Sequence, residues 1–214
     1  MEPEVTVLVP VYNRERYIET CLRSLFNQKT SIKFEVICID DGSTDMTFNI
    51  LSKYSDRITV VQNRENQGLP YSLNLGIQKS KGRYLVRVDS DDYVSNNFIE
   101  LLYYTIVSNP KFDAVACDYI TFGEKHDERI TESHKNPIAC GIIFKKESLI
   151  ALGGYNEEFL SHEDKEFRSR FDEKYEVIRL PIPLYRYRLH SDSITGNEEM
   201  SAYYLELLSK LGNE

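Results

Sequence analysis

The sequence predicts an α/β protein with a mostly parallel central sheet that is covered by helices on both faces. Short apolar runs alternate with stretches of helical periodicity through the first half of the chain. Each apolar run leads into a polar segment, which is the order expected of strands joined by crossover helices. The 214 residues, of which 41% are hydrophobic and 28% charged, suit one globular domain with a sizeable core.

Four buried strands are expected in the first half, because each is a short apolar run. They span residues 5–9, 34–39, 58–61 and 84–88. An apolar stripe at helical spacing predicts the first helix, and its members are Tyr17, Ile18, Cys21, Leu22, Leu25 and Phe26. Further helices are expected at about 45–54, from Gly68 onward with Pro70 in the first turn, and at 98–107.

The second half is less regular. Strands are predicted at 114–119, 142–144 and 184–189, and a helix at 163–171. The polar segment 123–137, with mixed charges, is interpreted as a long loop. An apolar stripe near the C-terminus comprises Met200, Tyr203, Tyr204, Leu207, Leu208 and Leu211. We expect this stripe to pack on the domain's own core, and a partner or membrane-surface face is the alternative.

Composition excludes some classes of partner. The net charge of −8 argues against nucleic acid, since binding to a phosphate backbone needs clustered Lys and Arg. The net charge does not exclude a nucleotide ligand, because a bound metal can supply the positive charge. The four cysteines lack C-x-x-C spacing, so we expect them to be small buried hydrophobes rather than zinc ligands or a redox pair. No apolar run approaches the ~20 residues that span a bilayer, and a cytoplasmic location is expected.

The most informative segment is Asp89-Ser90-Asp91-Asp92, which directly follows an apolar strand. Clustered carboxylates repel one another unless water or a cation lies between them, and hard oxygen ligands suit Mg²⁺ or Mn²⁺. An acidic turn that caps a helix is the alternative. Two other polar segments, 10–13 and 40–43, also follow strands, so all three should meet at one edge of the sheet, where open α/β sheets bind ligands.

Several motifs occur in the order typical of one family. They are Val9-Pro10-Val11-Tyr12-Asn13-Arg14, Asp40-Asp41-Gly42-Ser43-Thr44-Asp45, Asn66-Gln67-Gly68, Lys81-Gly82-Arg83-Tyr84, the acidic segment, Gly153-Gly154-Tyr155-Asn156-Glu157, Glu163-Asp164 and Tyr187-Arg188-Leu189-His190. From Val5 to about Thr195 the chain resembles the family 2 glycosyltransferases. The resemblance implies a type A, Rossmann-like α/β/α fold and an inverting transfer of sugar from a nucleoside diphosphate sugar to an acceptor hydroxyl.

The resemblance also implies a donor site. Nucleotide-binding residues would be Pro10, Val11, Tyr12, Asn13, Asp40, Asp41, Arg87, Asp89 and Ser90. Asp41 would accept a hydrogen bond from the pyrimidine base, although a turn with a helix cap is the other interpretation. Asp89 and Asp91, completed by His190, would hold Mn²⁺ or Mg²⁺, which stabilises the leaving nucleoside diphosphate.

On the acceptor side, Asp164 matches the family's catalytic base, which must reach the acceptor hydroxyl opposite the leaving group. Glu163 would make its neighbour Asp164 a stronger base or would bind the acceptor. Arg170 and Arg188, like Arg186, would neutralise diphosphate or bind an acidic acceptor, with surface ion pairing as the alternative. Acids at a helix N-terminus that stabilise its dipole are the other interpretation of Glu163-Asp164.

One departure from the family pattern concerns an arginine. Many members have Ala-Arg-Asn where this chain has Ser72-Leu73-Asn74. Arg87 lies two residues before Asp89, and we expect it to supply the missing positive charge near the nucleotide.

The expected organisation is a single glycosyltransferase domain at 1–195, with a nucleotide-sugar half at 1–110, an acceptor half at 111–195 and a C-terminal helix at 196–214. The predicted function is a metal-dependent inverting transfer of single sugars, from a UDP-sugar, to a surface polysaccharide or lipid-linked glycan. Peripheral contact with the inner face of the membrane and a homodimer are left open. The alternatives are a non-catalytic nucleotide-binding or scaffold module and, third, a nucleotidyltransferase, which would need a glycine-rich phosphate loop after the first strand.

Overall fold

The computed structural model describes residues 2–123 and 126–189 together with Tyr204 and Leu207. Its elements are β1 (Val5–Val11), α1 (Ile18–Phe26), β2 (Phe34–Asp40), α2 (Thr47–Ser52), β3 (Thr59–Gln62), α3 (Leu69–Lys79), β4 (Tyr84–Arg87), β5 (Tyr93–Val94), α4 (Phe98–Ser108), β6 (Ala114–Gly123), β7 (His126–Thr131), β8 (Ile142–Lys145), α5 (Lys146–Ala151), α6 (Glu163–Asp172) and β9 (Val177–Arg188). Within these residues the strands form one sheet, ordered β3-β2-β1-β4-β8-β6-β9-β5, with β7 added to β6.

The N-terminal half of the sheet is parallel, as predicted. β1 pairs in parallel with β2 on one side and with β4 on the other, and β2 pairs with β3. All seven residues of β1 are buried, because both of its edges and both of its faces are covered. The chain places β2 and β3 on one side of β1 and then crosses to β4 on the other. This reversal of direction leaves a crevice at the carboxyl ends of β1 and β4.

The C-terminal half makes the sheet mixed. β8 pairs antiparallel with both β4 and β6, whereas β6 and β9 pair in parallel with shifts in register. The C-terminal part of β9 also pairs antiparallel with β5, where Tyr93 lies opposite Arg186. This pairing carries the end of β9 back to the residues that follow β4.

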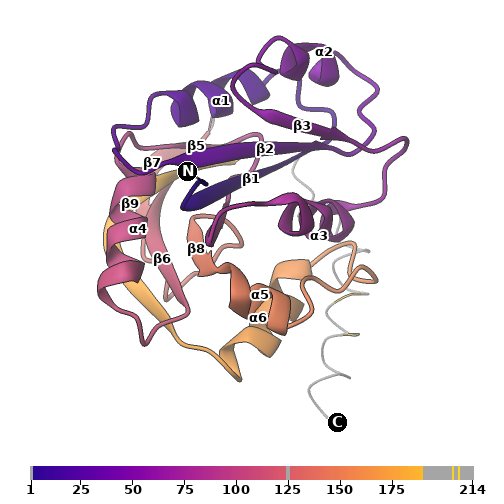
Figure 1. Ribbon diagram of the computed structural model, residues 1–214. Coiled ribbons are helices and arrows are strands. Elements are labelled where there is room, and N and C mark those ends of the chain that lie inside the picture. The colour runs from indigo at the N-terminus through magenta and orange to yellow at the C-terminus, as the bar shows by residue number, and fades with distance from the viewer. Residues whose placement is uncertain (1, 124–125, 190–203, 205–206, 208–214) are drawn as a thin grey trace.

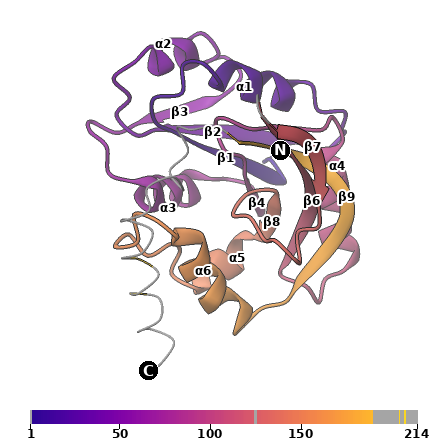
Figure 2. The same cartoon turned by 180° about the vertical axis from the view of Figure 1, so that it is seen from behind.

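Helices cover both faces of the sheet, so the predicted three-layer α/β/α class is confirmed (Figures 1 and 2). One core lies between the sheet and the layer of α1, α2 and α4, and alternate residues of β1, from Val5 to Val11, point into it. A second core lies on the side of α3, α5 and α6, where Leu8 of β1 packs with Phe167 and Phe171. The alternation of β1 side chains between two apolar layers explains why its sequence is apolar throughout.

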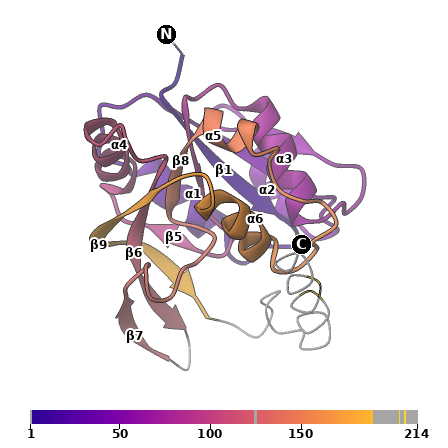
Figure 3. The same cartoon turned by 90° about the horizontal axis from the view of Figure 1, so that it is seen from below.

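The interpretation of 123–137 as a loop is wrong in part. His126–Thr131 is the strand β7, which pairs antiparallel with β6 and extends from the body of the protein (Figure 3). The strand is polar because it is an edge strand, so its sequence lacks the apolar pattern of a buried strand. The short strand β5 and the helix α5 are also additional to the prediction, and α2 is shorter than predicted.

The C-terminal stripe falls largely outside the described residues. Of its six members, the structure describes Tyr204, which is buried and has its ring 5.6 Å from that of Phe159, and Leu207. Among the described residues, none of the helices has the length and apolar character needed to cross a bilayer.

Gly82 shows how tightly β1 and β4 are joined. Its N–H donates a 2.9 Å hydrogen bond to Thr6 Oγ1, and a Cβ added at Gly82 would lie 2.5 Å from the backbone nitrogen of Thr6. Because backbone atoms cannot move aside as a side chain can, we expect Gly82→Ala to lower the free energy of unfolding by about 2 kcal/mol. Urea denaturation measures this, with the exposed neighbour Lys81→Ala as the control. Equal stability of the two variants would contradict the expectation.

Candidate active site

A cavity of about 310 Å³ opens at the carboxyl ends of β1 and β4. Eight of the residues predicted to form the site line it: Pro10, Arg87, Asp89, Ser90, Asp91, Glu163, Asp164 and Arg188. They come from β1, the end of β4, the segment that follows it, the start of α6 and the end of β9. The sheet topology therefore brings together residues that lie more than 170 positions apart in the chain.

The acidic loop, residues 88–92, forms one wall of this cavity. Arg87 donates from Nε to Asp89 Oδ1 at 2.6 Å and from Nη2 to Asp89 Oδ2 at 3.2 Å. Asp91 Oδ2 lies 3.3 Å from Nε of Arg14, a residue of the turn after β1. The side chains of Asp89 and Asp91 retain 23% and 18% exposure, so both remain accessible from the cavity.

Asp92 has a different environment from its two neighbours. It is buried, and it accepts hydrogen bonds from the Tyr185 hydroxyl at 2.8 Å and from the Arg188 N–H at 2.7 Å. Burial, with the charges of Asp89 and Asp91 close by, raises the pKa of Asp92 well above its usual range. The Tyr185 hydroxyl also accepts the Asp89 N–H at 3.0 Å. Asp92 therefore orders the acidic loop against β9, and a strand rather than a helix follows it.

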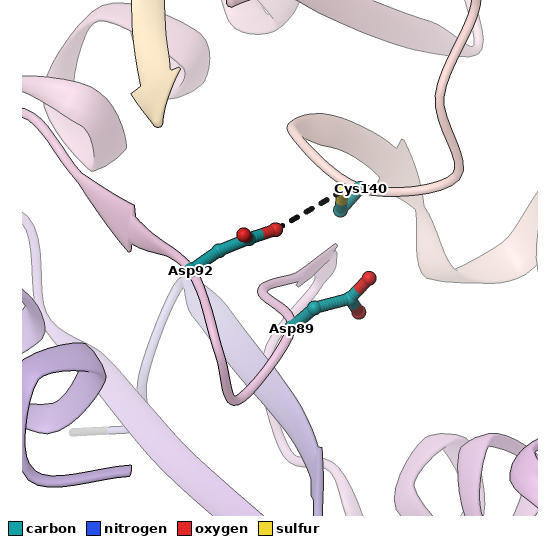
Figure 4. Close-up of side chains that lie close together, drawn as sticks. All are labelled: Asp89, Asp92 and Cys140. Atoms are coloured by element: carbon teal, nitrogen blue, oxygen red, sulfur yellow. Dashed lines mark hydrogen bonds between the residues drawn. The ribbon is translucent and has the colours of Figure 1, made fainter. Parts of the chain in front are cut away.

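Asp89, Asp92 and Cys140 converge on one point (Figure 4). One potential ligand atom from each lies within 4.8 Å of the others, and the Cys140 thiol donates a long 4.0 Å hydrogen bond to Asp92 Oδ2. Burial raises the pKa of the Cys140 thiol, which favours the neutral form rather than a metal-binding thiolate. Asp89 and Asp91 also line the cavity, and their carboxylates are hard oxygen ligands of the kind that Mn²⁺ and Mg²⁺ prefer. His190, the third expected ligand, lies outside the described residues.

The opposite wall is the start of α6. His162, immediately before the helix, has φ of 58°, a left-handed conformation that is uncommon for a residue other than glycine. Three acids, Glu163, Asp164 and Glu166, occupy the first turn, where the positive end of the helix dipole stabilises them. Asp164 lines the cavity together with His162 and Lys165.

Arg87 joins the two walls. It is buried, and besides its two bonds to Asp89 it donates from Nη1 to Glu163 Oε1 at 3.0 Å. Burial opposes the charge of Arg87, but the adjacent carboxylates of Asp89 and Glu163 outweigh it and raise the guanidinium pKa further. Burial raises the pKa of Glu163, and Arg87 opposes that rise. The guanidinium stays charged between two acids.

The turn after β1 contacts the turn after β2, as predicted from the parallel strands. The Asn13 N–H donates to Ser43 Oγ at 3.0 Å, and Asn13 Oδ1 accepts the Thr44 N–H at 2.8 Å. Asn13 adopts φ of 51°, and it does not cap α1, which begins at Ile18. Tyr12 is 41% exposed at this edge. Of residues 10–13, which were expected to bind the nucleotide, Pro10 lines the cavity and the other three are not part of its lining.

Asp40 and Asp41 are both buried at the end of β2. Asp41 accepts three hydrogen bonds, from the N–H groups of Gln67 and Gly68, each at 2.9 Å, and from Asn63 Nδ2 at 2.8 Å. Both oxygens of Asp41 thus anchor the segment that leads into α3. Asp40 accepts bonds from the Ser43 N–H and from Gln62 Nε2, each at 3.2 Å. Neither aspartate lines the cavity.

The three expected arginines differ in position. Arg188 lines the cavity, donates from Nε to the Asp91 carbonyl at 2.7 Å and lies over the rings of Tyr17 and Phe122. Arg170 does not line it: its guanidinium bonds Glu166 and the carbonyls of Leu152 and Gly154, which ties α6 to the loop after α5. Arg186 bonds the Pro183 carbonyl and also lies outside the cavity lining.

Sequence reasoning missed two cations of the site. Arg14 and Lys165 both line the cavity. Arg14 pairs with Asp91 of the acidic loop, and Lys165 lies in the first turn of α6. Arg14 is the last residue of the motif that begins at Val9, and Lys165 directly follows the motif Glu163-Asp164. This adjacency was the available signal.

The cavity thus combines clustered carboxylates at the end of β4 with a further carboxylate, Asp164, from the start of α6. Residues 6–179 match the family model described as Glycosyl transferase family 2. The chain belongs to glycosyltransferase family 2.

Relatives and solved structures agree with this family. The chain is 36% identical over 127 residues to the glycosyltransferase GlyA of Streptococcus pneumoniae, covering 58% of this chain and 18% of GlyA. The fold resembles TarS 1-349 of Staphylococcus aureus in complex with UDP-GlcNAc, with a TM-score of 0.77, 24% identity and coverage of 92% and 60%. It also resembles the mannosyltransferase PcManGT of Pyrobaculum calidifontis in complex with GDP-Man and Mn²⁺, with a TM-score of 0.75, 21% identity and coverage of 96% and 62%. The chain thus spans less than two thirds of each of these proteins.

Proposed function

We propose that this protein is a metal-dependent, inverting glycosyltransferase that moves a sugar from a UDP-sugar to an acceptor hydroxyl. The observation that carries the proposal is the cavity that Asp164 lines together with Asp89 and Asp91. An inverting transfer needs this separation of tasks, because the base must act on the acceptor while the donor diphosphate is held on the other side.

On the donor side, Asp89 and Asp91 would hold Mn²⁺ or Mg²⁺ and, with it, the diphosphate. The bound metal supplies Lewis-acid stabilisation of the departing nucleoside diphosphate. Arg14, Lys165 and Arg188 line the same cavity and contribute positive charge toward the phosphates. The solved neighbours whose titles name UDP, UDP-GlcNAc and GDP-Man support a nucleotide-sugar donor for this chain.

Asp41 would accept a hydrogen bond from the pyrimidine ring of the donor nucleotide, which would lie near residues 10–13. Its two oxygens already accept three bonds from Asn63, Gln67 and Gly68, so a fourth, from the base, would use the remaining acceptor site of the carboxylate. The buried position supports discrimination, because a mismatched base would leave a charged acceptor unpaired.

On the acceptor side, Asp164 would accept the proton of the attacking hydroxyl as the new glycosidic bond forms. Residues 111–195 would form the acceptor half, since residues 137–140, the start of α6 and the end of β9 line the cavity. We propose a surface polysaccharide or lipid-linked glycan as the acceptor, at the cytoplasmic side of the membrane. This part of the proposal follows from the family and from no particular residue.

Thermal unfolding with UDP, GDP, CDP and dTDP, each with and without Mn²⁺ or Mg²⁺, tests the donor site. A nucleotide at 100 times its dissociation constant stabilises the folded protein by about 2.7 kcal/mol. We expect a shift with UDP that depends on the metal. A binding module and an enzyme both give this shift, and UDP release from UDP-sugars then separates them. If no nucleotide shifts the transition at millimolar concentration, the donor site proposed for this cavity is wrong.

A further inference from the structure

We infer that Arg87 is a positioning residue for the transfer reaction, which holds the acidic loop and the first turn of α6 in one arrangement. The inference rests on the proposed function and deepens it. In this arrangement Arg87 acts through Asp89 and Glu163 and makes its contribution without binding the donor itself.

The guanidinium of Arg87 contacts two segments of the chain from a fixed position in the sheet. Arg87 is the last residue of β4, where its backbone pairs with Leu8 of β1 and its carbonyl accepts the Gly141 N–H at 3.3 Å. Its Nε and Nη2 hold both oxygens of Asp89, and Nη1 holds Glu163, which lies 76 positions later in the chain. A planar guanidinium can direct three bonds in this way, whereas the ammonium of lysine is a point charge on a flexible stem.

The charges explain why the arrangement is specific. The side chains of Arg87 and Glu163 are each only 9% exposed, so a carboxylate at Glu163 without Arg87 would be a buried and unpaired charge. Such a charge draws in water or leaves its position. Because Glu163 begins α6, a movement of its side chain also moves Asp164, the next residue and the proposed base.

The same contacts separate this role from direct donor binding. Leu73, at the position where many family members have an arginine, is buried in the core beside Ile77 and Leu85. Arg87 was expected to supply the missing charge to the nucleotide, yet its three bonds described above all go to protein carboxylates. When Arg87 is lost, the acidic loop keeps its contacts with β9 and with Arg14. Loss of Arg87 should therefore affect the rate of transfer more than the affinity for UDP.

Four variants test the inference: Arg87→Met, Arg87→Lys, Glu163→Gln and the double variant Arg87→Met/Glu163→Gln. Calorimetry measures the affinity for UDP with Mn²⁺, and UDP release from UDP-glucose and UDP-GlcNAc, with water as acceptor, measures the rate. We expect Arg87→Met to keep the UDP affinity within about threefold and to lower the rate by about 100-fold, the effect of misplacing a reacting group. The double variant removes the unpaired charge as well, and it should recover about tenfold of the lost rate.

Arg179→Met is the matched control. Arg179 also holds both oxygens of a buried aspartate, Asp118, through Nε and Nη2, but it lies away from the cavity. We expect this variant to lose thermal stability without a change in rate beyond about twofold, as for a site with no shared partners. A loss of rate as large as that of Arg87→Met would show that general destabilisation explains both.

The inference is overturned if Arg87→Met weakens UDP binding by tenfold or more and the double variant does not restore it, since Arg87 then binds the donor. It is also overturned if adding Glu163→Gln to Arg87→Met recovers none of the rate that Arg87→Met has lost. If Arg87→Met does not fold, Arg87→Lys decides: a rate lower by about tenfold with unchanged UDP affinity supports the inference, and a wild-type rate refutes it. Failure of the proposed function is distinguishable, because the wild-type protein itself would then neither bind UDP nor release it.

Discussion

Asp164→Asn is expected to lower sugar transfer by roughly 10²–10⁴-fold, because the amide cannot accept the proton of the acceptor hydroxyl. Asparagine has nearly the shape of aspartate, and Asp164 lines the cavity from α6 rather than from the acidic loop. The affinity for UDP with Mn²⁺ should therefore stay within about threefold of the wild-type value. The measurements are UDP release from UDP-sugars and calorimetric titration with UDP.

Asp172→Asn is the matched control for this substitution. Asp172 ends the same helix, is half exposed and pairs with Arg168 at 3.1 Å, away from the cavity. Its removal should leave the rate unchanged. Full activity of Asp164→Asn would show that Asp164 is not the base, and a loss of both rate and UDP affinity would assign it to donor binding instead.

The second large effect is expected from Asp91→Asn and Asp89→Asn, which each remove one of the proposed metal ligands. If a substitution weakens metal-dependent UDP binding by about 100-fold, the stabilisation of about 2.7 kcal/mol by UDP with Mn²⁺ should fall to about 0.4 kcal/mol at the same ligand concentration. Asp89→Asn also removes a charge that Arg87 balances, so Asp91→Asn gives the cleaner result.

Thermal unfolding with and without Mn²⁺ and UDP measures this difference, with the exposed carboxylate variant Asp56→Asn as the control. The control should keep the whole metal-dependent shift. If Asp91→Asn and Asp89→Asn keep it too, the metal is held elsewhere in the protein, and the assignment to the acidic loop fails.

The parallel half of the fold could be predicted because its information is local. Each of β1, β2 and β4 is an apolar run that leads into a polar turn, and helices follow the turns after β1 and β2. The edge strand β7 could not be predicted in this way. His126–Thr131 forms a strand because it pairs with β6, and its polar sequence follows from its exposed edge rather than from a buried face.

The motifs pointed to Asp89, Asp91 and Asp164 because each lies in a short local segment, and all three line the cavity. They could not show that Arg87 pairs with Glu163, since that contact depends on how α6 is laid against the end of β4. For Asp41 they predicted recognition of a base, whereas the structure adds its bonds to the segment before α3.

The amino-acid pattern alone was enough to define an α/β fold, its four N-terminal strands and the carboxylates at their carboxyl ends, because periodicity and turn chemistry act over a few residues. Which of the neighbouring acids is buried and which faces the cavity was decided by the tertiary structure. Asp89, Asp91 and Asp92 are almost adjacent in the chain, yet of the three only Asp92 is buried, where its carboxylate accepts bonds from Tyr185 and Arg188 of β9. Burial and charge pairing arise from segments distant in sequence, so the roles of such residues depend on the folded chain.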